Sequence, residues 1–195
     1  MKANILAAMN SLAVLRIILL FFGTLFFLYI SKKTLFNVKV HGFYRFFVFE
    51  VILFLIILNI PYWFSSPLST LQIISWIFLT ISIYLVIASI YYLKKVGSYR
   101  KRDLESANFK FENTANLVKD GIYKYIRHPM YSSLLFLSIA TMLKNLTLLT
   151  ILLTIIIIVF LILTAIIEEK ENKKYFGQVY DEYMIMTKMF IPFML

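Results

Sequence analysis

The sequence contains no cysteine and only five glycines among its 195 residues. Without cysteine the chain cannot form a disulfide, offer a thiolate to a metal ion or use a cysteine nucleophile. Five glycines leave little material for a glycine-rich nucleotide-binding fold. These absences exclude several common enzyme types, and we predict no metal site.

Charged residues are also scarce, at 15% of the chain, whereas 61% of it is hydrophobic. Soluble domains average about a quarter charged and about half apolar residues. A water-soluble core cannot absorb this excess, so the composition predicts a membrane protein in contact with lipid. The net charge of +10 is concentrated between the apolar runs, as in loops beside anionic lipid, and we expect no nucleic-acid partner.

Four long apolar runs and one short run predict the membrane helices. Each long run can cross a hydrocarbon core of roughly 30 Å at 1.5 Å per residue. The short run, 130–143, reaches only about 21 Å. Only Lys144 and Asn145 separate it from the next run, so we interpret the two as a helical hairpin, with a re-entrant short arm as the alternative. The long runs are 12–30, 46–64, 71–93 and 146–167.

These runs predict an all-α fold, a polytopic integral membrane helical bundle with about five transmembrane helices, the last two forming the hairpin. Residues 1–93 hold the first three helices. Residues 94–195 hold a polar connecting segment, the hairpin and a C-terminal tail. We expect one membrane domain in which the second part forms the functional site.

The distribution of Lys and Arg predicts the orientation. The segment 61–70 carries no charge, whereas the loops before and after it are basic. The positive-inside rule therefore places the basic loops in the cytoplasm and 61–70 outside. Five crossings then put the N-terminus outside and the C-terminus inside, so 94–128 and 168–195 share the cytoplasmic face. The basic residues are Lys32, Lys33, Lys39 and Arg45 before 61–70, and Lys94, Lys95, Arg100, Lys101, Arg102, Lys110, Lys119, Lys124 and Arg127 after it.

A helix start carries the first candidate site. Pro129 suits the first turn of a helix, where its missing N–H costs nothing. His128 then lies at the N-terminus of that helix, beside backbone N–H groups that favour an anion such as a carboxylate. The alternative is an ordinary basic helix end at the membrane interface.

The second candidate is the pair Glu168 and Glu169, which closes the last apolar run. Neighbouring positions on a helix differ by about 100°, so one carboxylate can turn inward while the other meets water. A carboxylate inside a bundle is costly without a cationic partner and therefore indicates a function. The alternative, favoured for Glu169, is that the pair marks where the helix leaves the membrane.

These features follow one another in a fixed order: G-x-Y-x-x-x-R-H-P-x-Y from Gly121, the hairpin, E-E, F-G-x-x-Y-x-x-Y from Phe176, and I-P at Ile191. The set resembles the isoprenylcysteine carboxyl methyltransferase family, in its short prokaryotic type, over residues 108–192. The resemblance implies a membrane methyltransferase that uses S-adenosylmethionine and releases S-adenosylhomocysteine.

The resemblance also implies which residues bind the cofactor: Leu117, Val118, Tyr123, His128, Pro129, Met130, Tyr131 and Glu168, with a weaker match at Asn108. Two positions depart from the family pattern. Ala115 stands where the family has a histidine, and Thr164 where it has an arginine implicated in substrate binding. The substrate is therefore less closely defined than the cofactor.

The chemistry agrees with these assignments. Glu168 can pair with the cationic groups of the cofactor, and His128 with the helix start can hold its carboxylate. Tyr123 and Tyr131 can pack on the remainder. The implied acceptor is lipophilic, the carboxylate of a prenylated cysteine or a similar group that enters from the bilayer. Such an acceptor is already ionised and needs no general base. We assign Glu168 and Arg127 to the catalytic centre, with Arg127 positioning the acceptor.

Three other functions remain open at this point. A phospholipid N-methyltransferase shares the cofactor but transfers the methyl group to an amine. An NADPH-dependent membrane reductase carries a similar Arg-His-Pro string. A non-enzymatic membrane scaffold would use its charges only to set its orientation.

Overall fold

Long helices make up most of the computed structural model. The structure describes residues 2–98 and 107–192, and within these ranges it describes the backbone alone for residues 2–10 and 110. An isolated β-bridge joins Ile126 and Lys188. The α-helices are α1 (Lys2–Ser31), α2 (His41–Asn59), α3 (Thr70–Val96), α4 (Pro129–Lys144), α5 (Leu148–Phe176) and α6 (Gln178–Met186), and short 3-10 turns are η1 (Ile60–Tyr62), η2 (Lys110–Glu112) and η3 (Gly121–Lys124).

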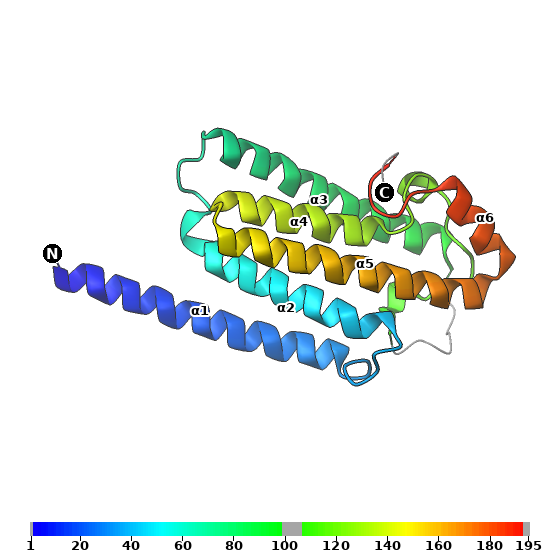
Figure 1. Ribbon diagram of the computed structural model, residues 1–195, viewed down its shortest axis with the longest axis horizontal. Coiled ribbons are helices and arrows are strands. Elements are labelled where there is room, and N and C mark those ends of the chain that lie inside the picture. The colour runs from blue at the N-terminus through cyan, green and yellow to red at the C-terminus, as the bar shows by residue number, and fades with distance from the viewer. Residues whose placement is uncertain (1, 99–106, 193–195) are drawn as a thin grey trace.

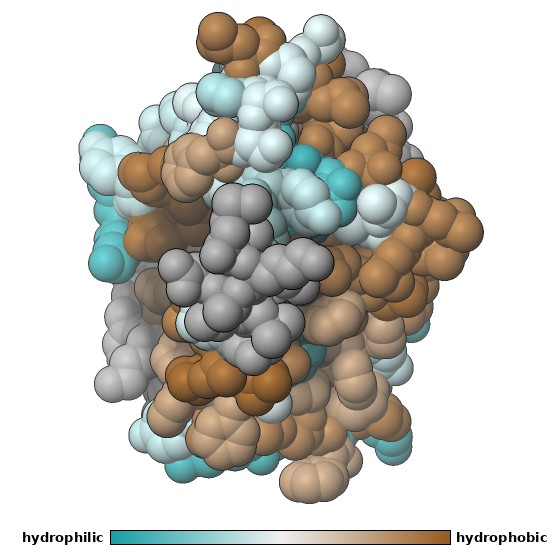
Figure 2. All heavy atoms as spheres, turned by 90° about the vertical axis from the view of Figure 1, so that its left-hand side faces the viewer, coloured by the Kyte–Doolittle hydropathy of each residue, from teal (hydrophilic) through white to brown (hydrophobic). Residues whose placement is uncertain are grey.

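The helices lie side by side, with α5 in the middle between α2 and α4, α3 beyond α4, and α1 beyond α2 (Figure 1). Four of them contain segments long and apolar enough to cross a membrane: Ser11–Ser31, His41–Tyr62, Thr70–Val96 and Leu148–Phe176. Apolar side chains form much of the outline of the molecule seen end-on (Figure 2). The predicted all-α membrane bundle is thus confirmed.

The predicted hairpin is formed by α4 and α5, which run side by side along the bundle (Figure 1). Three residues separate the two helices, and Thr147 caps α5 by accepting a hydrogen bond from the amide of Thr150. The 16 residues of α4 extend only about 24 Å. A complete crossing by α4 therefore stays a prediction, as does the count of five crossings.

The core lies where α2, α4 and α5 meet. Val48 and Leu55 of α2 and Ile157 of α5 are completely buried. Phe47 and Phe160 stack between α2 and α5 with ring centroids 5.2 Å apart. Apolar side chains gain little by leaving lipid for other apolar side chains, so this close packing, rather than hydrophobicity alone, holds the helices together.

A row of serines on α3 contacts α4 and η3, and the row runs along the bundle toward Tyr123. Ser75, Ser82 and Ser89 are seven positions apart, and all three are buried. Ser75 donates to the Ala140 carbonyl and Ser82 to the Ser133 carbonyl, both at 2.7 Å. Small hydroxyl side chains allow such close approach of two membrane helices. Ser89, the third member, contacts the Tyr123 hydroxyl at 2.6 Å.

A buried lysine closes the opposite end of the α3–α4 pair. The Lys144 ammonium donates to Oε1 of Gln72 at 3.0 Å and lies 3.6 Å from the ring centroid of Trp76. The hydrogen bond and the aromatic face together replace the water that the charge loses on burial.

The tail returns the chain to the start of α4. Gly177, with φ +61° and ψ −142°, ends α5 and allows the chain to turn sharply into α6. Beyond α6, the amides of Arg127 and His128 donate to the carbonyls of Lys188 and Met189, at 2.8 and 3.1 Å. This short pairing places the tail against the segment that begins α4.

Candidate functional site

A cavity opens at the end of the bundle where the tail meets the connecting segment. Its empty space, the open mouth included, is about 650 Å³, within the range of small-molecule sites. The residues proposed from the sequence all line it: Asn108, Leu117, Val118, Tyr123, Arg127, His128, Pro129, Met130, Tyr131 and Glu168. The structure therefore brings together residues up to 60 positions apart.

His128 lies at the predicted helix start. It is the residue before α4, and Pro129 occupies the first turn. The imidazole is buried and stacks on the Tyr131 ring at 5.3 Å between centroids. Ser132 donates to the Phe190 carbonyl at 2.6 Å, which fixes the tail over this turn. The first turn of a helix leaves backbone N–H groups without helical partners, so this edge of the cavity suits an anion.

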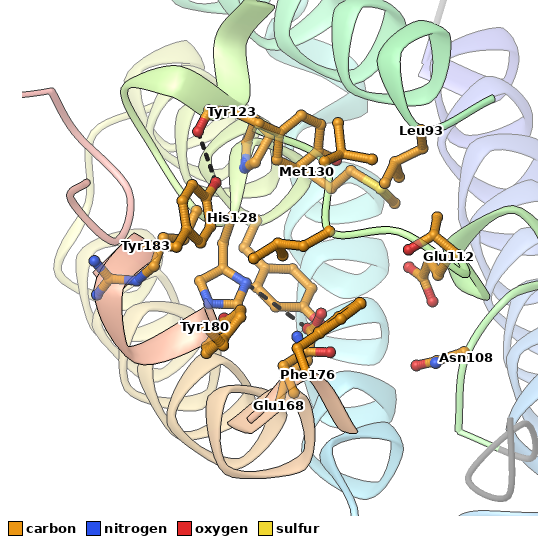
Figure 3. A pocket seen from close by; sticks show the side chains of 17 residues that line it. Leu93, Asn108, Glu112, Tyr123, His128, Met130, Glu168, Phe176, Tyr180 and Tyr183 are labelled. Atoms are coloured by element: carbon orange, nitrogen blue, oxygen red, sulfur yellow. Dashed lines mark hydrogen bonds and ion pairs between the residues drawn. The ribbon is translucent and has the colours of Figure 1, made fainter. Parts of the chain in front are cut away.

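Glu168 presents a carboxylate to the cavity (Figure 3). It accepts a hydrogen bond from the Tyr131 hydroxyl, and Nδ1 of His128 lies 3.8 Å from its Oε2. Its side chain is 23% exposed. The tyrosine restrains the carboxylate, which remains accessible to a ligand.

Glu169 differs from the expectation that it marks the helix exit. It is buried, and its Oε1 accepts from Nε of Arg127 at 2.7 Å and lies 3.3 Å from Nε2 of His128. Both carboxylates face inward because the segment before α4 and the tail cover α5 on two sides of its axis. About 100° of helical rotation is then not enough to bring Glu169 to water.

Arg127 lines the cavity but already has several protein partners. Besides Glu169, its Nη1 donates to the carbonyls of Met184, at 3.2 Å, and Thr187. An acceptor carboxylate would compete with these groups for the guanidinium. The predicted role of Arg127 in positioning the acceptor therefore stays a prediction.

Glu112 forms a second acidic wall, which the sequence analysis missed. Together with Asn108 it lies across the cavity from His128 and Tyr180 (Figure 3). Arg45 of α2 holds it through Nη1 at 3.0 Å from Oε2. The same guanidinium donates to the Ala107 carbonyl and lies 4.2 Å from the Phe109 ring centroid. Arg45 thus fixes the segment 107–112, whereas its sequence position suggested only a topology signal.

Buried tyrosines complete the cavity. Tyr183 donates to the Tyr123 carbonyl at 2.6 Å, and Tyr180 is buried beside it. Burial raises the pKa of both Tyr123 and Tyr183, and burial followed by the charges of Glu168 and Glu169 raises the pKa of Tyr180. Each hydroxyl consequently remains protonated at neutral pH, able to donate a hydrogen bond.

Several acidic side chains gather around the site, although the protein as a whole is basic. In the part of the chain that the structure describes, Glu112, Glu168, Glu169 and Glu171 lie near two guanidinium groups, Arg45 and Arg127, and near both histidines. Glu171 lies behind the site, 2.5 Å from Nδ1 of the fully buried His41. Among the described residues these four carboxylates outnumber the two guanidinium groups, in a chain whose net charge is +10. Such a site favours a cationic ligand.

Other lining residues had weak sequence signals or none. Phe176, Tyr180 and Tyr183 belong to the aromatic motif but were not assigned to the site. Asn172 lies four positions after Glu168, so helical periodicity could have placed it on the same face. Leu93, Glu112 and Thr114 also line the cavity, and nothing in their local sequence indicates it.

The two family departures occupy different surroundings. Thr164 is completely buried, and its hydroxyl donates to the Phe160 carbonyl at 2.6 Å. Ala115 lies outside the cavity lining, with its amide bonded to the Ser98 carbonyl at 2.7 Å. The Thr164 position offers no cation to an acceptor.

Residues 70–179 match the family model described as phospholipid methyltransferase. This range is more than half of the chain, and the protein belongs to that family of membrane methyltransferases. The family is related to the isoprenylcysteine carboxyl methyltransferases, so the predicted membrane methyltransferase is confirmed, whereas membership of the isoprenylcysteine carboxyl methyltransferases themselves stays a prediction. No curated protein and no solved structure matches the chain.

The Arg127–Glu169 pair leads to a stability prediction. Removing one partner of a buried ion pair typically costs about 3–5 kcal/mol, because the other charge is left without compensation. We expect Arg127→Met to lower the free energy of unfolding by this amount in detergent-solubilised protein, measured by denaturant titration. Arg127→Met/Glu169→Gln should recover part of the loss. Lys170→Met, at an exposed neighbouring position, is the control and should change stability by less than about 0.5 kcal/mol. Equal stability of Arg127→Met and Lys170→Met would contradict a structural role for the pair.

Proposed function

We propose that this protein transfers a methyl group from S-adenosylmethionine to a lipophilic acceptor that reaches the cavity from the bilayer. The observation that carries the proposal is an acidic, partly aromatic cavity at the end of a membrane bundle, in a chain of the phospholipid methyltransferase family. Family membership favours methyl transfer over the reductase and scaffold alternatives.

The cavity fits the chemical groups of this cofactor. S-adenosylmethionine carries a sulfonium, an ammonium, a carboxylate and an adenosine. Glu168 and Glu112 offer carboxylates to the cationic groups. His128 and the start of α4 suit the carboxylate. Leu93, Leu117 and Val118 provide an apolar wall for the purine.

When bound, S-adenosylmethionine supplies a methyl group already activated by the positive sulfur. The protein therefore needs no covalent nucleophile and acts through alignment and exclusion of water. Tyr131 restrains Glu168, and Arg45 restrains Glu112, so both walls are held before a ligand arrives. The buried tyrosines of α6 shield the cavity from solvent.

Two acceptor classes follow from this proposal. The resemblance favours the carboxylate of a prenylated cysteine, for which Arg127 is the positioning cation. An amine-bearing phospholipid is the second class, and the structure supplies observations in its favour. Arg127 is engaged by Glu169 and two carbonyls, whereas Glu168, which accepts from the Tyr131 hydroxyl, keeps a carboxylate 23% exposed in the cavity. We therefore propose the amine-bearing phospholipid as the leading acceptor, with its ammonium group drawn in by the acidic side chains of the cavity. The ammonium gives up a proton to a cavity carboxylate or to water, and the lone pair of the neutral amine then attacks the methyl carbon while the carbon–sulfur bond breaks and S-adenosylhomocysteine leaves.

Cofactor binding is tested by calorimetric titration with S-adenosylhomocysteine. We expect saturable binding to the purified protein, weakened about tenfold to a hundredfold by Glu168→Gln and by His128→Ala, because each removes a charged or hydrogen-bonding group from the cavity. Glu182→Gln, on the exposed face of α6, is the matched control and should bind as the wild type does. Absence of saturable binding to the wild type would refute the proposed function.

The acceptor is tested with radiolabelled S-adenosylmethionine and parallel lipid substrates. We expect methyl incorporation into dioleoyl phosphatidylethanolamine to exceed incorporation into N-acetyl-S-farnesylcysteine. Boiled protein and Glu168→Gln serve as controls. Preferential methylation of the farnesylcysteine would reverse the choice of acceptor while leaving the cofactor assignment intact.

The orientation is tested by cysteine labelling, since the chain has no cysteine of its own. We propose that the site faces the cytoplasm, as the basic loops indicate. Ser65→Cys and Glu182→Cys introduce single thiols at exposed positions near opposite ends of the bundle. In intact cells, a membrane-impermeant maleimide should label only Ser65→Cys. After lysis, the same reagent should label both variants. Labelling of Glu182→Cys in intact cells would invert the topology.

A further inference from the structure

A second, mainly apolar cavity lies between α5 and the tail. Ile162 forms its wall on α5, and Met184, Met189 and Phe190 form the wall on the tail. Its empty space, including the open mouth, is about 800 Å³. Arg127 lines both this groove and the first cavity, so the two spaces adjoin at this residue.

The groove extends from the functional site toward the bilayer. Ile162 precedes Glu168 by six positions, which places it about 9 Å further along α5, into the membrane-crossing segment. Its side chain is 38% exposed. Arg127 and the exposed Lys188 also line the groove. The groove therefore combines apolar surface with the ammonium-bearing side chain of Lys188.

We propose that this groove holds an acyl chain of the phospholipid acceptor, with its phosphate near Lys188 and its head group directed past Arg127 into the first cavity. This inference rests on the proposed function. It identifies the groove as the part of the protein that orients the acceptor. The proposed function alone does not require such a groove.

The chemistry of the groove favours a flexible hydrocarbon chain anchored at an anionic group. Methionine side chains adapt to irregular apolar partners, which suits an acyl chain of variable shape. A cation beside an apolar channel matches the junction of a phospholipid, where phosphate meets glycerol and acyl chains. An acyl chain gains little free energy on moving from lipid to an apolar groove. Its main effect is consequently to orient the reacting group.

The test compares two substitutions at neighbouring positions of α5. Ile162→Trp fills the groove, whereas Leu163→Trp adds the same bulk outside both cavities at nearly equal exposure, 37% against 38%. For each variant, kcat/KM is measured with dioleoyl and with dihexanoyl phosphatidylethanolamine. We expect Ile162→Trp to lower the value for the dioleoyl lipid about tenfold or more, because the reacting group is misplaced. The kcat/KM for the dihexanoyl lipid should change less than twofold in Ile162→Trp. Leu163→Trp should leave kcat/KM unchanged for both lipids.

Two outcomes overturn the proposal: loss with Ile162→Trp that is independent of chain length, or no loss at all. Unchanged binding of S-adenosylhomocysteine shows that Ile162→Trp is folded. If Ile162→Trp does not fold, Ile162→Phe obstructs the groove with a smaller side chain. Should the wild type methylate neither lipid, phosphatidylethanolamine is not the acceptor, and the groove is tested separately. Phosphatidylethanolamine with an acyl diazirine should then crosslink to Met184, Met189 or Phe190, with competition by unlabelled lipid and loss in Ile162→Trp. Crosslinking elsewhere only, or without competition, would refute the assignment.

Discussion

Carboxylates on the last turns of α5 connect the parts of the chain that form the site. Glu168 accepts from Tyr131 of α4, Glu169 pairs with Arg127 before α4, and Glu171 pairs with His41 at the start of α2. Their different rotations about the helix axis let one helix contact several neighbours at once. Buried charges are tolerated only with such partners, so the bundle end and the site depend on the same pairs.

The bundle also determines where the cavity can form. Close contacts through Ser75 and Ser82 hold α4 against α3, and Ser89 continues the series to Tyr123 in the cavity wall. Beyond the apolar part of the bundle, polar loops can reach water. The segment 107–118 and the tail pack there. Helix contacts within the membrane thus place the start of α4 beside the end of α5, although neither segment would hold a ligand alone.

Several features were predictable because they depend on neighbouring residues. The apolar runs predicted the long helices, since a span needs only length and hydrophobicity. Pro129 predicted the start of α4, since its ring suits a first helical turn. The direction of Glu169 was not predictable in this way, because it depends on which segments cover α5. Glu112 was missed for a similar reason: its partner, Arg45, is 67 positions away.

The sequence by itself therefore determined the membrane bundle, the start of α4 and a set of site residues, all of which line the cavity. The tertiary structure decided which of their charges are available. Arg127 is engaged by Glu169 within the protein, whereas Glu168 keeps a partly exposed carboxylate in the cavity. The groove beside Ile162 likewise exists only because the tail folds back on α5. The physical reason is that hydrophobicity and helix starts are local properties, whereas charge pairing and cavity shape arise from contacts between distant segments.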